Sequence, residues 1–229
     1  MNIVMVGGSH GIGSNYYKNA KKKGDSIKVL SRTQGELSDE DWIQCDILKV
    51  VNGETVFPET FETIDALIYL PGTVNLGIIK QFSAEQMIED LKLNVVGAFV
   101  TVKACMKALK TSENASITLM SSIVAQTGMS LHSMVGSSKG AVEGLMRNLA
   151  AELSPKIRVN ALAISLVDTP LTKSLTKNEK TLEISKAKHP LKRIGNPEEI
   201  AEMLQVLTHF SKWMTGQVVT VDGGISALR

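Results

Sequence analysis

Residues 2–13 read NIVMVGGSHGIG, an apolar run followed by a turn with glycines at positions 7, 8, 11 and 13. The apolar run predicts a buried strand, and the residues after the turn have the apolar spacing of a helix. In such a turn, glycine lets the backbone come close to a pyrophosphate, and the first amides of the helix point at its negative charge. The spacing is GxxxGxG and not the generic GxGxxG, so a purely structural connection is the alternative reading at this point.

The rest of the chain repeats this alternation of strand-like and helix-like segments. Short apolar runs predict further strands over residues 27–30, 42–45, 66–70, 116–120, 158–161 and 218–221. Apolar residues at three- and four-residue spacing predict helices over residues 13–22, 84–110, 136–153 and 197–210. Together they predict an α/β fold, a Rossmann-like doubly wound sheet of about seven parallel strands flanked by helices. No linker or internal repeat divides the sequence, so we expect one domain over residues 1–229, with polar loops or lids at residues 33–41 and 172–189.

Composition argues against several other classes of protein. The chain has 229 residues, 43% of them hydrophobic, which is enough for one substantial core. Its formal charge of +2 is too small to argue for nucleic acid or an anionic membrane as a partner. Cys45 and Cys105 have no paired spacing, so we expect neither a metal site nor a disulfide framework. With no signal-like segment and no uncharged apolar stretch of membrane-spanning length, a soluble, cytoplasmic protein is expected.

Ordered motifs along almost the whole chain resemble those of one enzyme family. They are the glycine turn, Cys45-Asp46-Ile47 after the third strand, LNVVG at 93–97, Ser121-Ser122, SKGAVEG at 138–144, RVNA at 158–161, RIGNPEEIA at 193–201 and TGQVVTVDGG at 215–224. Through them the chain resembles the short-chain dehydrogenase/reductase (SDR) family, and within it the 3-oxoacyl-carrier-protein reductases. The resemblance implies a nicotinamide cofactor and a carbonyl or alcohol substrate.

The resemblance also implies which residues act in catalysis. In this family a serine orients the substrate carbonyl, a tyrosine gives or takes its proton, a lysine lowers the tyrosine pKa and holds the nicotinamide ribose, and an asparagine maintains a water relay. Carried over, Ser122, Lys139 and Asn94 keep these positions. The tyrosine position, four residues before Lys139, is occupied by Val135. We therefore expect an atypical active site, because valine cannot transfer a proton.

His132 is the nearest candidate for a replacement acid. It lies seven residues before Lys139, which is two helical turns, so the two side chains would share a helix face if the helix begins early enough. The enoyl-thioester reductases of the wider family resemble this spacing, with their tyrosine seven residues before the lysine. Histidine changes its charge near neutral pH, which suits a proton donor. The alternative is that His132 lies at a solvent-facing loop edge.

Arg32 is the main sequence signal for cofactor choice. Ser31-Arg32 follow the second strand, where an acidic residue would select NAD(H), and arginine instead favours the 2′-phosphate of NADP(H). His10 could add a contact to that phosphate, although Arg32 could also be an ordinary exposed arginine. With the resemblance, the expected cofactor site comprises Gly7, Ser9, His10, Gly11, Ile12, Gly13, Ser31, Arg32, Cys45, Asp46, Ile47, Leu70, Pro71, Gly72, Lys139 and Thr169.

Some positions depart from the family pattern close to this site. Tyr69-Leu70-Pro71-Gly72 stands where the family has Asn-Asn-Ala-Gly, and Val6 replaces a threonine before the first glycine. Ile164-Ser165 replaces Pro-Gly after the sixth strand. These changes remove side chains that would tie neighbouring strand ends together, so we expect the cofactor pocket to be retained with altered detail.

Two further segments suggest partners. The region 172–193, which resembles a substrate lid in family members, carries seven basic residues: Lys173, Lys177, Lys180, Lys186, Lys188, Lys192 and Arg193. These could recruit an anionic carrier-bound thioester, or they could simply form a solvated helix face. Residues 84–110 and 136–153 resemble the paired helices of family dimers and tetramers, and Val142, Leu145, Met146 and Leu149 suggest apolar surface for a homo-oligomer.

Two classes of function are compatible with these residues. The first is an NADP(H)-dependent oxidoreductase acting on a 3-oxoacyl thioester or similar small ketone, with its proton supplied through Ser122, Lys139, water or His132. The second is a cofactor-binding regulatory or assembly subunit without redox turnover. The retained serine, lysine and asparagine favour the first class, and Val135 favours the second.

Overall fold

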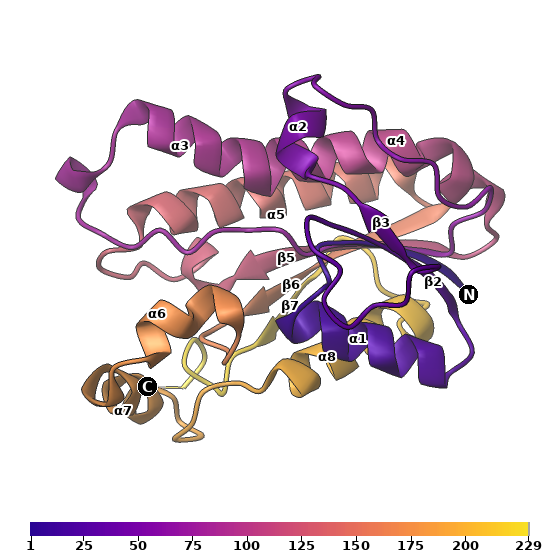
Figure 1. Cartoon of the computed structure of the whole chain (residues 1–229). Coiled ribbons are helices and arrows are strands. Elements are labelled where there is room, and N and C mark those ends of the chain that lie inside the picture. Colours follow the sequence, from indigo (N-terminus) through magenta and orange to yellow (C-terminus); the bar gives the residue numbers. More distant parts are fainter. Residues whose placement is uncertain (229) are drawn as a thin grey trace.

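A single parallel sheet forms the centre of the molecule (Figure 1). The structure is a computed structural model that describes residues 1–228. Its strands run in the order β3-β2-β1-β4-β5-β6-β7, and all neighbouring pairs are parallel. They comprise β1 (Asn2–Val6), β2 (Ser26–Ser31), β3 (Trp42–Gln44), β4 (Ala66–Tyr69), β5 (Ala115–Ser122), β6 (Ile157–Ile164) and β7 (Val218–Val221). The predicted Rossmann-like doubly wound sheet is confirmed, with β1 and β7 at the predicted bounds.

Helices cover both faces of the sheet. They are α1 (Gly11–Lys22), α2 (Ile47–Val51), α3 (Ala84–Leu91), α4 (Gly97–Thr111), α5 (Ser133–Leu153), α6 (Lys173–Thr176), α7 (Glu179–Lys188) and α8 (Pro197–Gln205). Figure 1 shows α1 and α8 on one face and α4 and α5 on the other. Wider π-helical turns continue α3 into α4 (Lys92–Val96) and extend α8 (Val206–Phe210). Short 3-10 helices occur at Ile79–Gln81, Ile123–Ala125 and Pro170–Thr172.

Alternate residues of each strand face opposite helical layers, as the strand pleat requires. Ile3 and Met5 belong to the core beneath α1 and α8, whereas Val4 and Val6 belong to the core beneath α4 and α5. All four side chains are at most 2% exposed. The strands are therefore buried on both faces, which explains their almost continuous apolar sequence.

The sequence was misleading in two segments. Residues 172–189, expected as a polar loop or lid, contain the helices α6 and α7. Helix α7 has no buried residue, so it has no apolar stripe for a pattern search to find. On α5, Val142, Met146 and Leu149 do not provide free apolar surface, because they are packed in the core of this chain.

At the amino-terminal edge of the sheet, polar side chains are paired with one another. The Thr208 hydroxyl lies 3.0 Å from the Tyr16 hydroxyl and 2.8 Å from Nδ1 of His209. The other ring nitrogen of His209 lies 2.9 Å from the carboxylate of Asp25, just before β2. This buried network joins α1, β2 and the segment before β7. No helix among residues 1–228 is both long enough and apolar enough to cross a bilayer.

Candidate functional site

The candidate site lies where the strand order reverses. Strand β1 pairs with β2 on one side and with β4 on the other, so the connections after β1 and β4 leave the sheet in opposite directions. Ligands of such sheets bind at this point, outside the carboxyl ends of the strands. The predicted segments meet there: Leu70 donates a backbone hydrogen bond to Val6, at 2.9 Å, and a Cβ on Gly7 would lie 3.1 Å from Pro71.

The turn after β1 needs its glycines. Gly7 and Gly11 have φ angles of 72° and 58°, in the left-handed region that favours glycine. A Cβ on Gly13 would overlap Gly8, so the helix and the turn can pack closely only without one. Helix α1 begins at Gly11, has no acidic residue in its first turn, and receives no side-chain cap from His10. Its first amides, including that of Ile12, can therefore receive an anionic group, as the pyrophosphate of a dinucleotide requires.

The expected 2′-phosphate region lies where the loop after β2 packs on this turn. The Ser9 hydroxyl lies 3.2 Å from that of Thr33 and 2.9 Å from Nδ1 of His10. Arg32 is exposed beside Thr33. Ser31 differs from expectation, because its buried hydroxyl donates to the carbonyl of Thr33 and accepts from the indole of Trp42. Ser31 thus has a structural role, and Arg32 is the exposed residue of the predicted pair.

The segments after β3 and β6 complete the expected cofactor surface. Asp46 caps α2 by accepting a hydrogen bond from the Leu48 amide at 3.0 Å, with buried Cys45 and Ile47 on either side of it. After β6, Thr169 faces the glycine turn, with its Cβ 3.4 Å from where a Cβ on Gly11 would lie. The glycine turn, the start of α1 and the loops after β2, β3 and β6 therefore lie along one surface. The residues on this surface fit a bound dinucleotide.

Lys139 and Asn94 meet beside Gly72. A Cβ on Gly72 would lie 2.9 Å from Nζ of Lys139 and 3.0 Å from Oδ1 of Asn94. Lys139 is buried, and its ammonium group donates to the carbonyl of Met120 at 3.0 Å. Burial lowers the pKa of Lys139 to about 8, against an opposing effect of Asp90. Oδ1 of Asn94 is a buried acceptor without a hydrogen-bond partner among residues 1–228, so it is available to a ligand or water.

Ser122 ends β5, the strand that also carries Met120. Its hydroxyl donates to the carbonyl of Ile164, at the end of the neighbouring strand β6, at 3.2 Å. Ser122 is only partly buried, so its hydroxyl lies at the carboxyl edge and not in the core. A hydroxyl that donates to a main-chain carbonyl can turn to donate to a substrate oxygen instead.

Helix α5 brings the two positions discussed for proton transfer near its start. It begins at Ser133, three residues earlier than predicted, so His132 is its N-cap residue and Val135 lies in its first turn. Val135 is buried, whereas His132 is half-buried with Nδ1 2.7 Å from the carbonyl of Ser130. His132 thus lies at the boundary of the helix that carries Lys139, with its ring beside a loop carbonyl, and its role as a proton donor stays a prediction.

None of the three tyrosines of the chain supplies a hydroxyl to this site. Tyr16 is bonded to Thr208, and Tyr17 donates to Asp41 at 2.9 Å. Tyr69 donates to the carbonyl of Leu93 at 2.6 Å, and its hydroxyl fills the space where Gly97 would otherwise carry a Cβ. Burial raises the pKa of both Tyr16 and Tyr69. A proton donor at this site must therefore come from another residue type.

The sequence reasoning missed Asp90, which lies one helical turn before Asn94. Its carboxylate is 1% exposed and accepts hydrogen bonds from Thr73, Asn75, Asn94 and Ser138. In the sequence it stands in the polar stretch EDLK, which is typical of a surface helix face. Only the fold shows that it points inward.

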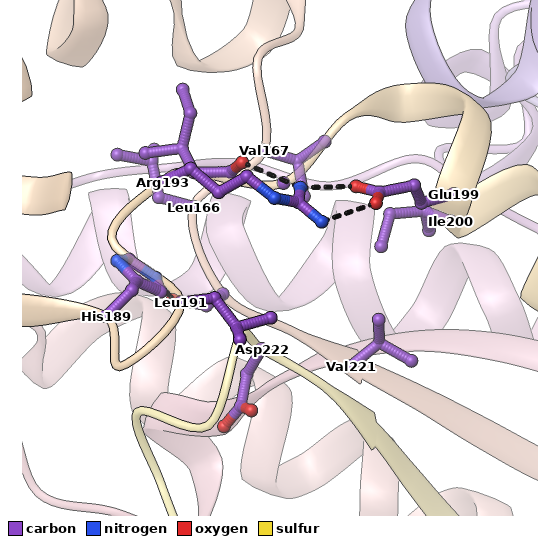
Figure 2. Close-up of a pocket in the computed structure, with 13 residues that line it drawn as sticks. Leu166, Val167, His189, Leu191, Arg193, Glu199, Ile200, Val221 and Asp222 are labelled. Carbon is purple, nitrogen blue, oxygen red and sulfur yellow. Dashed lines mark hydrogen bonds and ion pairs between the residues drawn. The ribbon is translucent and has the colours of Figure 1, made fainter.

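A cavity of about 250 Å³ lies between β6, β7 and the start of α8 (Figure 2). Its wall includes Leu166 and Val167, which precede Thr169, and the pair formed by Arg193 and Glu199 at 2.6 Å. Figure 2 shows this ion pair on the cavity wall, with His189 and Asp222 on the opposite side. Arg193 is therefore engaged within the fold, and it is not a free cation of the predicted basic lid.

Comparisons with known proteins agree with this fold. The family described as "Enoyl-(Acyl carrier protein) reductase" matches residues 10–226. The human 3-oxoacyl-[acyl-carrier-protein] reductase is 31% identical over 237 residues, covering 98% of each chain. The zebrafish (Danio rerio) carbonyl reductase family member 4 is 30% identical, again over 98% of each chain. The ligand-free aldohexose dehydrogenase of Thermoplasma acidophilum superposes with a TM-score of 0.89 at 27% identity, covering 100% of this chain and 94% of that one.

These matches define the class: the chain belongs to the short-chain dehydrogenase/reductase family. Its relatives within that family include 3-oxoacyl-[acyl-carrier-protein] and carbonyl reductases, to which it is similar over nearly its whole length.

Proposed function

We propose that this chain is an NADP(H)-dependent oxidoreductase that acts on a carbonyl or alcohol, with a 3-oxoacyl thioester or similar small ketone as substrate. One observation carries the proposal: Lys139 and Asn94 flank one space at Gly72, next to the turn that fits a dinucleotide. The similarity to 3-oxoacyl-[acyl-carrier-protein] reductases supports this substrate class. The exposed Arg32 supports NADP(H) over NAD(H).

Different residues of the chain have different roles in carbonyl reduction. When bound, the reduced nicotinamide supplies the hydride. Ser122 donates a hydrogen bond to the carbonyl oxygen, and Lys139 lies close enough to Asn94 for the two to hold a shared water. As charge develops on that oxygen, a positioned donor stabilises it by typically 10²- to 10⁴-fold in rate.

Lys139 is the proton donor that this geometry favours. Val135 is shorter than a tyrosine, so it leaves the space between the ammonium group and the substrate oxygen to substrate or water. With a pKa near 8, the ammonium form predominates at neutral pH and loses its proton more readily than an ordinary lysine. His132 is the second candidate, because it occupies the same helix two turns earlier.

Steady-state NADPH oxidation with ketones, diketones and acyl thioesters tests the proposal. If Lys139 donates through the space at Val135, Val135→Tyr raises turnover, because tyrosine would then lie one turn from Lys139. If His132 is the acid, His132→Ala lowers turnover by about 10²-fold, and Val135→Tyr has little effect. NADPH binding without turnover in all three proteins would contradict a redox function.

A cofactor-binding subunit without turnover is the competing proposal. The engagement of all three tyrosine hydroxyls elsewhere in the fold favours it. Under this alternative the protein binds NADPH, Val135→Tyr creates no activity, and NADPH alters the affinity for a partner enzyme.

Homo-oligomerisation through α4 and α5 is a further part of the proposal. Phe99 is 50% exposed on α4 and Val96 is 38% exposed just before it, which offers apolar surface beside α5. Light scattering at micromolar concentration should give a dimer or tetramer mass, and Phe99→Glu should shift it toward the monomer. A monomeric mass for the natural protein would refute this.

The basic segment supports an anionic, carrier-bound form of the thioester. Figure 1 shows α6 and α7 projecting beyond the carboxyl ends of the strands, where a lid would lie. Lys186 is paired with Glu183, but Lys173, Lys177 and Lys180 are exposed and have no ion-pair partner among residues 1–228. KM for a carrier-bound thioester should therefore rise with ionic strength, whereas KM for a small ketone should not.

A further inference from the structure

Asp90 is a buried carboxylate whose acceptor positions are all in use. Thr73 and Asn75, from the loop after β4, donate to Oδ1, with the Asn75 amide at 2.8 Å. Ser138, on α5, and Asn94, in the π-helical turn, donate to Oδ2, with the Asn94 amide at 3.2 Å. A carboxylate offers about four lone-pair sites, and four donors from three elements occupy them. Such a set satisfies the hydrogen-bonding capacity of a buried carboxylate.

The same contacts orient Asn94. Its amide nitrogen is held by Asp90, at 3.2 Å from Oδ2 and 2.9 Å from the main-chain carbonyl. The amide nitrogen and oxygen lie on opposite branches of the group, so Oδ1 is turned to the space at Gly72 that Nζ of Lys139 also faces. Asp90 therefore fixes the orientation of Asn94, whose Oδ1 has no hydrogen-bond partner among residues 1–228.

Asp90 also supplies the negative charge that compensates Lys139. Burying an ammonium ion is costly unless an opposite charge lies near it. Of the two buried carboxylates around α5, Asp90 is the one bonded to Ser138, next to Lys139, and to Asn94, which shares the space at Gly72 with Nζ of Lys139. Its charge opposes the effect of burial on the pKa of Lys139. Glu143, one turn further along the helix, is instead bonded to Ser121 at 2.8 Å and paired with Arg147.

We propose that Asp90 is a positioning residue of the reaction site, which keeps Lys139 as an ammonium ion and aims the carbonyl of Asn94 at it. The inference rests on the proposed function, since it makes Lys139 a competent proton donor. The proposal adds Asp90, a buried carboxylate, to the three residues Ser122, Lys139 and Asn94.

The other charged groups around Asp90 and Lys139 lie at the surface or are bonded elsewhere, so the effect on the charge of Lys139 is specific to Asp90. On α3, Glu85 and Glu89 lie at the surface, and Glu89 is paired with Lys92 of the π-helical turn at 2.6 Å. Strands β4 and β5 contribute Tyr69, Met120, Ser121 and Ser122 to this region, of which Tyr69 is bonded to Leu93. Among residues 1–228, Asp90 is therefore the carboxylate that governs the charge state of Lys139.

NMR titration of the ¹³Cε and ¹⁵Nζ signals of lysine tests the inference without using activity. The Lys139 signal is assigned by its loss in Lys139→Met, and its midpoint is measured in the natural protein, in Asp90→Asn and in Glu143→Gln. We expect the midpoint to fall by about one pH unit in Asp90→Asn, a tenfold change in the ammonium-to-amine ratio. Glu143→Gln, which also removes a buried carboxylate near α5, should leave it unchanged. An unchanged midpoint in Asp90→Asn would overturn the proposal.

The pH dependence of kcat/KM gives the second readout. Reduction requires the ammonium form, so kcat/KM falls as pH rises through the midpoint of Lys139. In Asp90→Asn this fall moves to lower pH, so activity drops about fivefold at pH 8 and recovers toward pH 6. A loss at every pH, with the NMR midpoint unmoved, would contradict the role in charge control.

The two readouts separate this inference from the proposed function. If no carbonyl is reduced by the natural protein, the NMR titration still decides whether Asp90 controls Lys139. Asparagine can replace aspartate here with its amide nitrogen at the position of Oδ1, because the Thr73 hydroxyl can rotate and the Asn75 amide can turn over to accept from it. Should Asp90→Asn not fold, the natural protein alone remains decisive, because a neutral Lys139 amine at pH 7 would defeat the proposal.

Discussion

Two groups of polar side chains, one at each edge of the sheet, are arranged in opposite ways. At the amino-terminal edge, Tyr16, Thr208, His209 and Asp25 form a chain in which each group bonds to the next. At the carboxyl-terminal edge, Oδ1 of Asn94 has no partner among the described residues, and the backbone is bare at its glycines. Mutual pairing stabilises the fold, whereas groups held in place without a partner remain free for a ligand. The same sheet therefore has one edge that supports stability and one that supports chemistry.

Gly13→Ala should have the largest effect, because it changes the turn at the carboxyl-terminal edge, where the cofactor is expected to bind. The added Cβ overlaps Gly8, so the turn must open, and we expect the free energy of unfolding to fall by about 3 kcal/mol, with loss of NADPH binding. Denaturant unfolding and calorimetric titration measure the two effects. Gly128→Ala is the control, because its Cβ meets nothing within 4 Å and its φ is not left-handed, so both quantities should stay as in the natural protein.

Thr208→Val should affect stability alone. It keeps the size of the side chain but leaves the Tyr16 and His209 groups without their shared hydroxyl, at a cost of about 2 kcal/mol in the free energy of unfolding. NADPH affinity should remain that of the natural protein, since the site lies at the other edge. A clear loss of affinity, measured in the same titration, would mean that the two edges are coupled.

Arg32→Asp should have the smallest effect and act on affinity alone. Arg32 is exposed, so its loss should not change stability, but a negative charge there repels a 2′-phosphate. We expect the natural protein to bind NADPH more tightly than NADH by about tenfold, and the variant to reverse that order. Equal affinities for the two cofactors in the natural protein would remove the basis of the NADP(H) assignment.

The sequence predicted most of the fold because strands and helix starts depend on neighbouring residues. The run before Gly7 and the glycines after it are local signals, and both were interpreted correctly. Asp90 could not be found this way, because its burial depends on the loop after β4 and on α5, which approach it only in the folded chain. Ser31 is the opposite case. The sequence placed its hydroxyl in the cofactor site, but in the folded chain this hydroxyl accepts a hydrogen bond from Trp42.

Helix α7 was missed for a different reason. Its sequence is that of a solvent-exposed helix, with charged side chains all round and Asn178 as its cap. Apolar periodicity detects only helices that bury a face, so a helix held at the surface requires attention to caps and helix-forming residues instead.

The contact between Tyr69 and Gly97 makes the tolerance of one position depend on the other. The Tyr69 hydroxyl occupies the volume of the side chain that Gly97 lacks, and it is tied there to the carbonyl of Leu93. A side chain at position 97 would overlap the Tyr69 hydroxyl, so this placement of the tyrosine requires glycine there. Tyr69 can therefore be exchanged for a smaller residue while Gly97 is kept, whereas Gly97 can be exchanged only if Tyr69 changes as well.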